Sequence, residues 1–450
     1  MNRKILAGLF IIALGSGFFW NQKIFNKPIS SDQVIYDGVA SDILSKGTFT
    51  YEGQETASEP AYPYFLAGIY KIFGHNFNAV RVIQIILFAF TVLLVFSLAQ
   101  PLTGTLVALG AALLTSVFYP LANQAGLLLQ ETLFTFLVVS LVFALSKARH
   151  DRLQWYFGSG IILGLATLTK GSIEFFFIFV VGYMFWIYRK KIPLKQIFKR
   201  IGIFLIGFII IVGPWLAREK FMGGNLGVAP RGGSTLLILT EVTEHLSQNY
   251  LGNFIGFFFG YYIAQKFYPD IDPVAFRDFS ATQKRIADLT QKGTSLREMD
   301  GLFLKEAKDY IIYNPQKYAY MAVLNFINLN SPIVIKGPLW QNVTAIHPMF
   351  ADGRHPGLPE IVKAGIALGV RLVWFVLFFL VGYCIWINWK NLDKFGWIIL
   401  LVAYLNIFYS LVWTVPRYAL PMYPLYFILA VVGFSHLWGR YSQLLQKTRK

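Results

Sequence analysis

The stretch Val80–Ala99, VRVIQIILFAFTVLLVFSLA, is long and apolar enough to cross a lipid bilayer as one helix. Similar stretches recur along the chain, in which 56% of the residues are hydrophobic and the mean hydropathy is +0.52. Backbone polar groups inside a bilayer must pair within the protein, and helices pair them within each segment. The sequence therefore predicts an all-α polytopic membrane protein. The predicted spans are Ile5–Trp20, Val80–Ala99, Thr105–Tyr119, Glu131–Ser146, Trp155–Thr169, Ile173–Tyr188, Ile201–Leu216, Ile361–Ile387, Phe395–Trp413 and Leu420–Leu437.

Basic residues gather in five short segments that connect the predicted spans or end the chain. These segments hold 17 of the 40 Lys and Arg residues but only two of the 23 Asp and Glu residues. Short basic loops usually face the cytoplasm, so both chain ends are predicted inside. This distribution explains the net charge of +17 without a nucleic-acid partner, for which the sequence offers no basic soluble module. The segments are Met1–Lys4, Lys147–Arg152, Arg189–Arg200, Trp389–Lys394 and Arg440–Lys450.

This topology predicts one transmembrane module, residues 1–450, with two sizeable loops on the outer side. The first outer loop covers residues 21–78, and a long outer loop with amphipathic helices covers residues 217–360. Two apolar stretches in the long loop, Phe254–Ala264 and Tyr318–Ile335, either lie in the membrane interface or cross the membrane as a pair. We favour the interfacial reading, because the first stretch is too short to span and three asparagines interrupt the second.

The first outer loop carries a candidate catalytic carboxylate. Asp32 follows the first predicted span by about a dozen residues, so it should lie near the outer membrane surface. A carboxylate there can act as a general base toward an acceptor hydroxyl. Tyr36 follows four residues later, and Glu59 precedes a Pro-Ala-Tyr-Pro stretch. The alternative is that Asp32 only caps a loop helix.

The segment around Asp32 resembles the first outer loop of the GT-C glycosyltransferases. The resemblance is strongest to the branch that contains the protein O-mannosyltransferases and the lipid A aminoarabinose transferase. That branch typically shows an Asp with a Tyr four residues later, often with a second acid that is Gln33 here. Glu219 likewise replaces the usual Asn of a later motif. Further similar fragments follow in the family's order over nearly the whole chain: Gln130–Phe134, Gly164–Gly171, Pro214–Arg218, Asn314-Pro315 and Arg417–Pro421.

The resemblance implies a GT-C-type helix bundle with juxtamembrane helices on the outer surface. It also implies an inverting glycosyltransferase that moves a sugar from a polyprenyl-phosphate carrier, with Asp32 as the base. Lys170, Arg218 and Arg417 would then hold the donor phosphate, because such a leaving group needs cations more than a strong acid. Alternatively, each of these cations is an ordinary helix-end residue that snorkels to the interface. The remaining substrate-site candidates are Tyr36, Glu59, Glu131 and Tyr418.

The sequence assigns no cofactor and no metal ligand. A divalent metal at Glu131, or at outer histidines such as His347 and His355, is an alternative, although these histidines lack zinc-helix spacing. Glu131 could also be a first-turn carboxylate that the helix dipole favours. The one cysteine, Cys384, lies in a predicted span, which excludes an intramolecular disulfide framework.

The predicted partners are the polyprenyl-phosphate-linked sugar donor, a protein, lipid or glycan acceptor, and membrane lipids. The predicted location is a bacterial or archaeal cytoplasmic membrane, with the candidate site facing outward. The alternative function is a transporter or flippase of lipid-linked sugars. A transporter should carry its charges and helix breaks near the middle of the membrane. Here the candidate charges lie at the outer ends of spans, which favours chemistry there.

Overall fold

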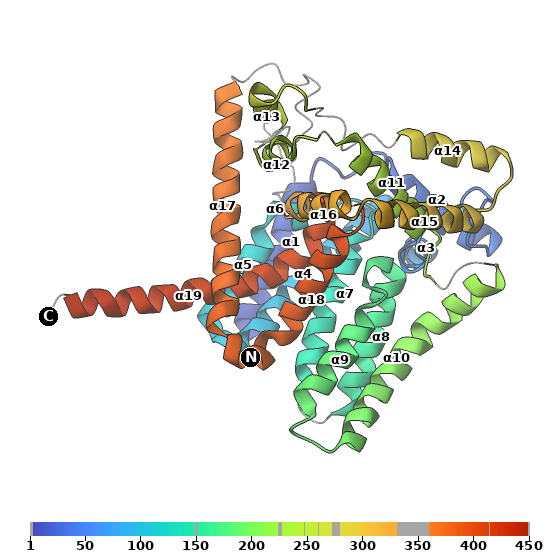
Figure 1. The fold of residues 1–450 in the computed structure, drawn as a ribbon. Helices are drawn as coiled ribbons and strands as arrows, with labels where there is room; N and C mark the ends of the chain where they lie inside the picture. The colour runs from blue at the N-terminus through green and yellow to red at the C-terminus, as the bar shows by residue number, and fades with distance from the viewer. Residues whose placement is uncertain are drawn as a thin grey trace.

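The computed structural model describes residues 3–148, 152–223, 227–246, 248–259, 261–271, 280–330, 360–413 and 415–448. These residues form helices joined by turns (Figure 1). The α-helices are α1 (Arg3–Asn21), α2 (Asp32–Lys46), α3 (Ala61–Phe73), α4 (Phe77–Thr103), α5 (Thr105–Val117), α6 (Tyr119–Gln124), α7 (Glu131–Lys147), α8 (Leu153–Thr169), α9 (Phe176–Tyr188), α10 (Leu194–Phe221), α11 (Gly232–His245), α12 (Tyr250–Phe259), α13 (Tyr261–Phe267), α14 (Ser280–Gln291), α15 (Leu296–Tyr313), α16 (Pro315–Leu329), α17 (Glu360–Ile387), α18 (Leu392–Ser410) and α19 (Tyr423–Thr448). Short 3-10 helices are η1 (Gly171–Ile173), η5 (Trp389–Asn391) and η6 (Pro416–Met422).

Each predicted span coincides with a helix: α1, α4, α5, α7, α8, α9, α10, α17, α18 and α19. The predicted all-α polytopic membrane fold is therefore confirmed, and Cys384 is buried in α17 as expected. Among the described residues, five segments are long and apolar enough to cross a membrane: Arg3–Asn21, Phe77–Thr103, Gly171–Tyr188, Leu194–Phe221 and Arg417–Gly439. Shorter apolar helices are Thr105–Val117, Leu372–Ile387 and Lys394–Ser410.

Helices α8 and α10 pack closely because glycines from both helices lie at their contact. A Cβ atom on Gly160 would lie 2.0 Å from the backbone oxygen of Phe204, and one on Gly207 would lie 2.4 Å from that of Phe157. Any larger residue would push the helices apart. Close backbone packing of this kind is a main source of helix association in lipid, where apolar burial gains little. The contact fixes α8, whose C-terminal end leads into Lys170.

The buried side chain of Arg81, 1% exposed, holds together the loops that precede α2 and α7. Its Nη2 donates to the backbone oxygen of Lys27 at 2.9 Å, and its Nε donates to that of Gly126 at 3.3 Å. Gln33 adds a second link, because its Oε1 accepts a hydrogen bond from Leu128 N at 3.0 Å. The starts of α2 and α7 are thereby held near each other.

The two ends of the bundle differ in structure. In Figure 1, α11, α14, α15 and α16 lie across the upper end, while the α9–α10 turn lies at the lower end. The apolar stretches of the long loop form α12, α13 and α16, and the 15 residues of α16 reach only about 22 Å. A hydrocarbon core is about 30 Å thick, so α16, like the 13-residue α5, is shorter than the core. The interfacial position of these stretches stays a prediction, and residues 331–335 lie outside the described residues.

Candidate active site

Asp32 lies at the start of α2, where its carboxylate meets Arg417 of η6. The distance from Arg417 Nη2 to Asp32 Oδ2 is 2.5 Å, and the Asp32 side chain is 44% exposed. Asp32 is the first helical residue, and Ser31 is the N-cap. The alternative that Asp32 itself is the N-cap is therefore wrong, although a carboxylate in the first turn is still favoured by the helix dipole. Its exposure leaves Asp32 accessible to a substrate.

Glu131 is a buried carboxylate that contacts both Lys170 and Arg417. It is the first residue of α7, and its side chain is 3% exposed. Its Oε1 lies 3.4 Å from Arg417 Nε and 3.5 Å from Lys170 Nζ. Glu131 thus contacts Lys170 and Arg417, two of the three cations predicted to hold the donor phosphate.

Lys170 follows the last residue of α8, with an extended backbone that turns its side chain into the protein. The side chain is 6% exposed, and Nζ lies 3.8 Å from the ring centroid of Tyr418. Despite the nearby carboxylate of Glu131, Nζ has no hydrogen-bond partner in the structure. A buried ammonium group without a hydrogen bond is costly. Its position therefore suits an anionic ligand that supplies acceptor oxygens.

Glu59 and Arg231 form a second pair beside Lys170. Glu59 is 4% exposed, and its Oε2 lies 3.2 Å from Arg231 Nη1. Its Oε1 accepts a hydrogen bond from Gly171 N, the residue after Lys170, at 3.4 Å. Above all the charge of Glu59 raises the pKa of Arg231, whose side chain is 43% exposed. Arg231 is therefore a fixed cation of this site.

The sequence motifs do not predict Arg231 as a site residue. Its only local signal is the Pro230-Arg231-Gly232-Gly233 stretch, which indicates a turn before a helix. The structure shows that Arg231 immediately precedes α11 and pairs with a carboxylate 172 residues earlier. That partner follows from tertiary packing and not from local sequence.

Tyr36 lies one turn after Asp32 and is buried, with its ring edge-on to Tyr62 at a centroid distance of 5.1 Å. Burial, and then the charges of Glu59 and Glu131, raise the pKa of Tyr36 well above its usual range. The hydroxyl therefore stays protonated, which makes it a hydrogen-bond donor rather than a base.

Two further acids of the first outer loop are engaged elsewhere. Asp37 accepts a hydrogen bond from Tyr70 at 2.7 Å and pairs with His75 at the same distance. Asp42 pairs with Lys46 at 2.7 Å, and this contact, together with bonds from its own loop, lowers the pKa of Asp42 to about 2. Of these three acids, Asp32 is the one that contacts Arg417, the cation that shares Glu131 with Lys170.

The structure places Arg218 apart from Lys170 and Arg417. Arg218 Nη1 lies 2.6 Å from Glu219 Oε1, and the guanidinium stacks 4.5 Å from the ring centroid of Trp215. Arg297 pairs with the same Glu219 at 2.8 Å. These residues line a cavity of about 330 Å³ that also contacts Ser58 and Pro230, the chain neighbours of Glu59 and Arg231. Arg218 therefore belongs to an adjoining cavity, and its role toward a phosphate stays a prediction.

A metal site is not apparent in the part of the chain that the structure describes. No group of three His, Cys, Asp or Glu residues there is arranged to hold an ion. His347 and His355 lie outside the described residues.

Comparison with known proteins adds to this geometry. Residues 57–217 match the family model described as dolichyl-phosphate-mannose-protein mannosyltransferase. The archaeal oligosaccharyltransferase AglB from Archaeoglobus fulgidus, solved with an inhibitory peptide and a dolichol-phosphate, aligns with 99% of this chain and 52% of its own, at a TM-score of 0.55 and 13% identity. The chain resembles the GT-C glycosyltransferases. The resemblance that the sequence motifs predicted is thus confirmed, although the structural likeness at this identity shows the fold alone.

Two curated relatives match less than half of this chain. An undecaprenyl phosphate-alpha-4-amino-4-deoxy-L-arabinose arabinosyl transferase from Pseudomonas paraeruginosa is 29% identical over 199 residues, which are 41% of this chain and 36% of the relative. The enzyme of that name from Pseudomonas aeruginosa is 24% identical over 226 residues, or 48% of this chain and 40% of the relative. The chain therefore matches about two fifths of the length of these relatives. The segment that matches the family model contains Glu59, Glu131 and Lys170, whereas Asp32, Arg231 and Arg417 lie outside it.

Proposed function

We propose that the protein is an inverting glycosyltransferase that moves a sugar from a polyprenyl-phosphate carrier to an acceptor hydroxyl. The observation that carries this proposal is the buried Lys170 Nζ, which lacks a hydrogen-bond partner and shares the Glu131 carboxylate with Arg417. A lipid phosphate would supply the missing acceptor oxygens. Arg417 also contacts the accessible Asp32, so the phosphate position and a candidate base would be neighbours. The names of the relatives, which act on lipid-phosphate-linked sugars, support the same donor class.

In the proposed reaction, Asp32 accepts the proton of the acceptor hydroxyl while the acceptor oxygen bonds to the anomeric carbon of the sugar. The bond from that carbon to the phosphate oxygen breaks, and its electron pair leaves with the polyprenyl phosphate. A single displacement of this kind inverts the anomeric configuration. Lys170 and Arg417 would stabilise the charge on the leaving phosphate, which is a stable anion and needs no strong acid.

Glu131 and Glu59 act as positioning residues in this proposal. A buried cation such as Lys170 needs a paired charge, because isolated ions are strongly penalised away from water. Glu131 would hold Lys170 and Arg417 near each other, and Glu59 would hold Arg231 beside them. A bound phosphate would then compete with Asp32 and Glu131 for Arg417. This competition would free the Asp32 carboxylate for the acceptor once the donor is bound.

We further propose that the site faces the outer side of a bacterial or archaeal cytoplasmic membrane. The basic segments that the positive-inside rule places in the cytoplasm include residues 189–200, which contain the α9–α10 turn at the lower end in Figure 1. The candidate site lies at the start of α7 and the end of α8. The basic segment Lys147–Arg152 connects the other ends of these two helices. The acceptor is a protein, a lipid or a glycan that reaches Asp32 from the outer side.

The proposal is tested with purified protein in nanodiscs and a radiolabelled polyprenyl-phosphate sugar. Candidate acceptors are supplied separately, and transferred label and free polyprenyl phosphate are both measured. We expect label on one acceptor class, with an equal amount of released polyprenyl phosphate. Movement of the labelled lipid between leaflets of sealed vesicles without any glycosidic transfer would contradict the proposal and favour a flippase.

A further inference from the structure

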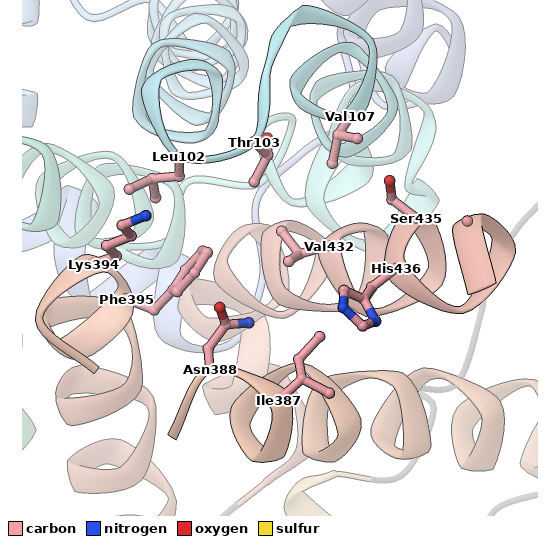
Figure 2. A pocket seen from close by; sticks show the side chains of 11 residues that line it. Leu102, Thr103, Val107, Ile387, Asn388, Lys394, Phe395, Val432, Ser435 and His436 are labelled. Atoms are coloured by element: carbon pink, nitrogen blue, oxygen red, sulfur yellow. The ribbon is translucent and has the colours of Figure 1, made fainter. Parts of the chain in front are cut away.

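A second cavity lies at the end of the bundle opposite the candidate active site. Its volume is about 560 Å³, and it is formed where the α4–α5 turn meets the end of α17, the start of α18 and the later part of α19 (Figure 2). The residues that line it include Thr103, Asn388, Lys394, Ser435 and His436. None of them takes part in the proposed transfer reaction.

The polar side chains of this cavity suit a phosphate. Lys394 supplies an ammonium group and Ser435 supplies a hydroxyl, while the Asn388 amide already donates to the Cys384 backbone oxygen at 2.9 Å. His436 Nδ1 contacts the Tyr383 hydroxyl at 3.1 Å, which orients the ring and leaves Nε2 as its other polar atom. The described residues that line the cavity include no acidic residue. Among the described residues, the cavity therefore offers donors to an anion without a competing carboxylate like that of Glu131 beside Lys170.

The apolar surroundings indicate that this anion is part of a lipid. Trp386 is 69% exposed and Trp438 is 62% exposed, and these residues belong to α17 and α19, which line the cavity. Large exposed aromatic residues near the ends of membrane helices are typical of the headgroup region of a bilayer. A ligand with a polar head in the cavity could lay its acyl chains along these helices.

The charge at this end of the bundle agrees with an anionic lipid. The cavity includes Lys394, the last residue of the basic segment Trp389–Lys394, and the segment Arg189–Arg200 contributes six further basic residues at the same end of the bundle. Basic regions next to membrane helices attract anionic lipid head groups. We propose that this cavity binds the phosphate of an anionic phospholipid head group.

The test counts bound lipids by native mass spectrometry on the purified full-length protein. Mildly delipidated protein is titrated with phosphatidylglycerol or with phosphatidylcholine. We expect one phosphatidylglycerol to bind more tightly than any phosphatidylcholine. Lys394→Gln should weaken that binding about tenfold, because it removes the one charged donor among the described lining residues, a loss of about 1.4 kcal/mol.

Two further variants separate the cavity from general surface charge. Lys390→Gln removes the same charge from η5, outside the cavity lining, and should leave phosphatidylglycerol affinity unchanged. Ser435→Phe fills part of the cavity without changing charge and should weaken the binding. Equal losses in Lys390→Gln and Lys394→Gln would overturn the proposal. So would unchanged affinity in both Lys394→Gln and Ser435→Phe.

A soluble competitor distinguishes a lipid from a free phosphate. We expect glycerol phosphate to displace phosphatidylglycerol only weakly, because it lacks the acyl chains that the aromatic rim would contact. Glycerol phosphate that binds as tightly as the lipid would show that the cavity takes a soluble anion and would overturn the lipid assignment. Because each readout is lipid binding, failure here would leave the proposed transfer reaction unaffected.

Discussion

The two ends of the helix bundle differ in how their cations are paired. At the candidate active site, Lys170 and Arg417 lie beside Glu131, Arg231 pairs with Glu59, and Arg417 also meets Asp32. At the opposite end, Lys394 and His436 line a cavity whose described residues include no acid. Buried cations must be paired because desolvation is costly, whereas exposed cations near lipid head groups need no protein partner. The pairing of its cations thus distinguishes the candidate active site from the cavity that we propose binds a lipid.

The strongest contrast between the two ends should be their labelling from opposite sides of the membrane. In a Cys384→Ala background, cysteines at Lys195 and Lys390 should resist a membrane-impermeant thiol reagent in intact cells, while Ser45→Cys should react. Ser45 is exposed and helical, whereas nearby Gly53 has a φ of +82° that strains any side chain. Labelling is read by gel mobility after thiol tagging. The reverse pattern would place the candidate site inside the cell and contradict the proposed orientation.

The next largest effect is expected at Asp32. Asp32→Asn keeps the size of the side chain but removes its ability to accept a proton, so kcat should fall by about 100-fold or more. Donor affinity should survive, because the cations remain in place. The measurement is steady-state transfer with the labelled donor.

Asp37→Asn is the matched control, since Asp37 lies in the same helix but contacts Tyr70 and His75. It should retain most activity. An active Asp32→Asn protein, or an inactive Asp37→Asn protein beside it, would show that the base is a different carboxylate.

A smaller effect should distinguish the two arginines for which the sequence predicted the same role. Arg417→Ala should weaken donor binding or turnover by about 1.5 to 3 kcal/mol, the usual cost of losing a charge-assisted contact. Arg218→Ala should cost less, because Arg218 pairs with Glu219 and stacks on Trp215 in the adjoining cavity. The effects of both variants are measured as changes in KM and kcat for the donor. Equal losses would mean that the phosphate site extends to Arg218.

A small change is expected in the pH dependence of stability, through Asp42 on the surface near the candidate site. The pKa of Asp42 falls to about 2, chiefly through its bond from Lys46, so its ionised form is favoured by folding. The resulting stability is present above the ordinary carboxyl pKa and is lost as pH falls toward about 2. Asp42→Asn should therefore lower the melting temperature at neutral pH and flatten its fall in acid. A melting curve with the same acid dependence in both proteins would show that Asp42 contributes nothing.

Most of the fold could be predicted because apolar length is a property of local sequence. The predicted spans coincide with helices, but their limits were less accurate: the span Ile201–Leu216 became α10, which runs from Leu194 to Phe221. Charged residues such as Lys195 and Arg218 ended the apolar pattern before the helix itself ended. Hydropathy marks the lipid boundary, whereas backbone hydrogen bonds continue past it.

The candidate site was predictable only where residues carried a motif. Asp32, Lys170 and Arg417 fell within fragments that resembled a family, and the structure brings them together around Glu131. Arg231 was missed because a single arginine in a long loop has no periodic or motif signal. Such pairings depend on how distant helices pack, which local sequence does not encode.

Binding of a lipid phosphate at Lys170 is tested most directly by measuring donor affinity in two variants. Affinity for polyprenyl phosphate is measured for the wild type, Lys170→Met and Glu131→Gln, with melting temperatures to confirm folding. Lys170→Met should lose about tenfold or more in affinity, because the buried ammonium is gone. Glu131→Gln should weaken binding less than Lys170→Met, because both cations remain but lose the carboxylate that holds them near each other. Unchanged affinity in a folded Lys170→Met protein would show that the phosphate is held elsewhere.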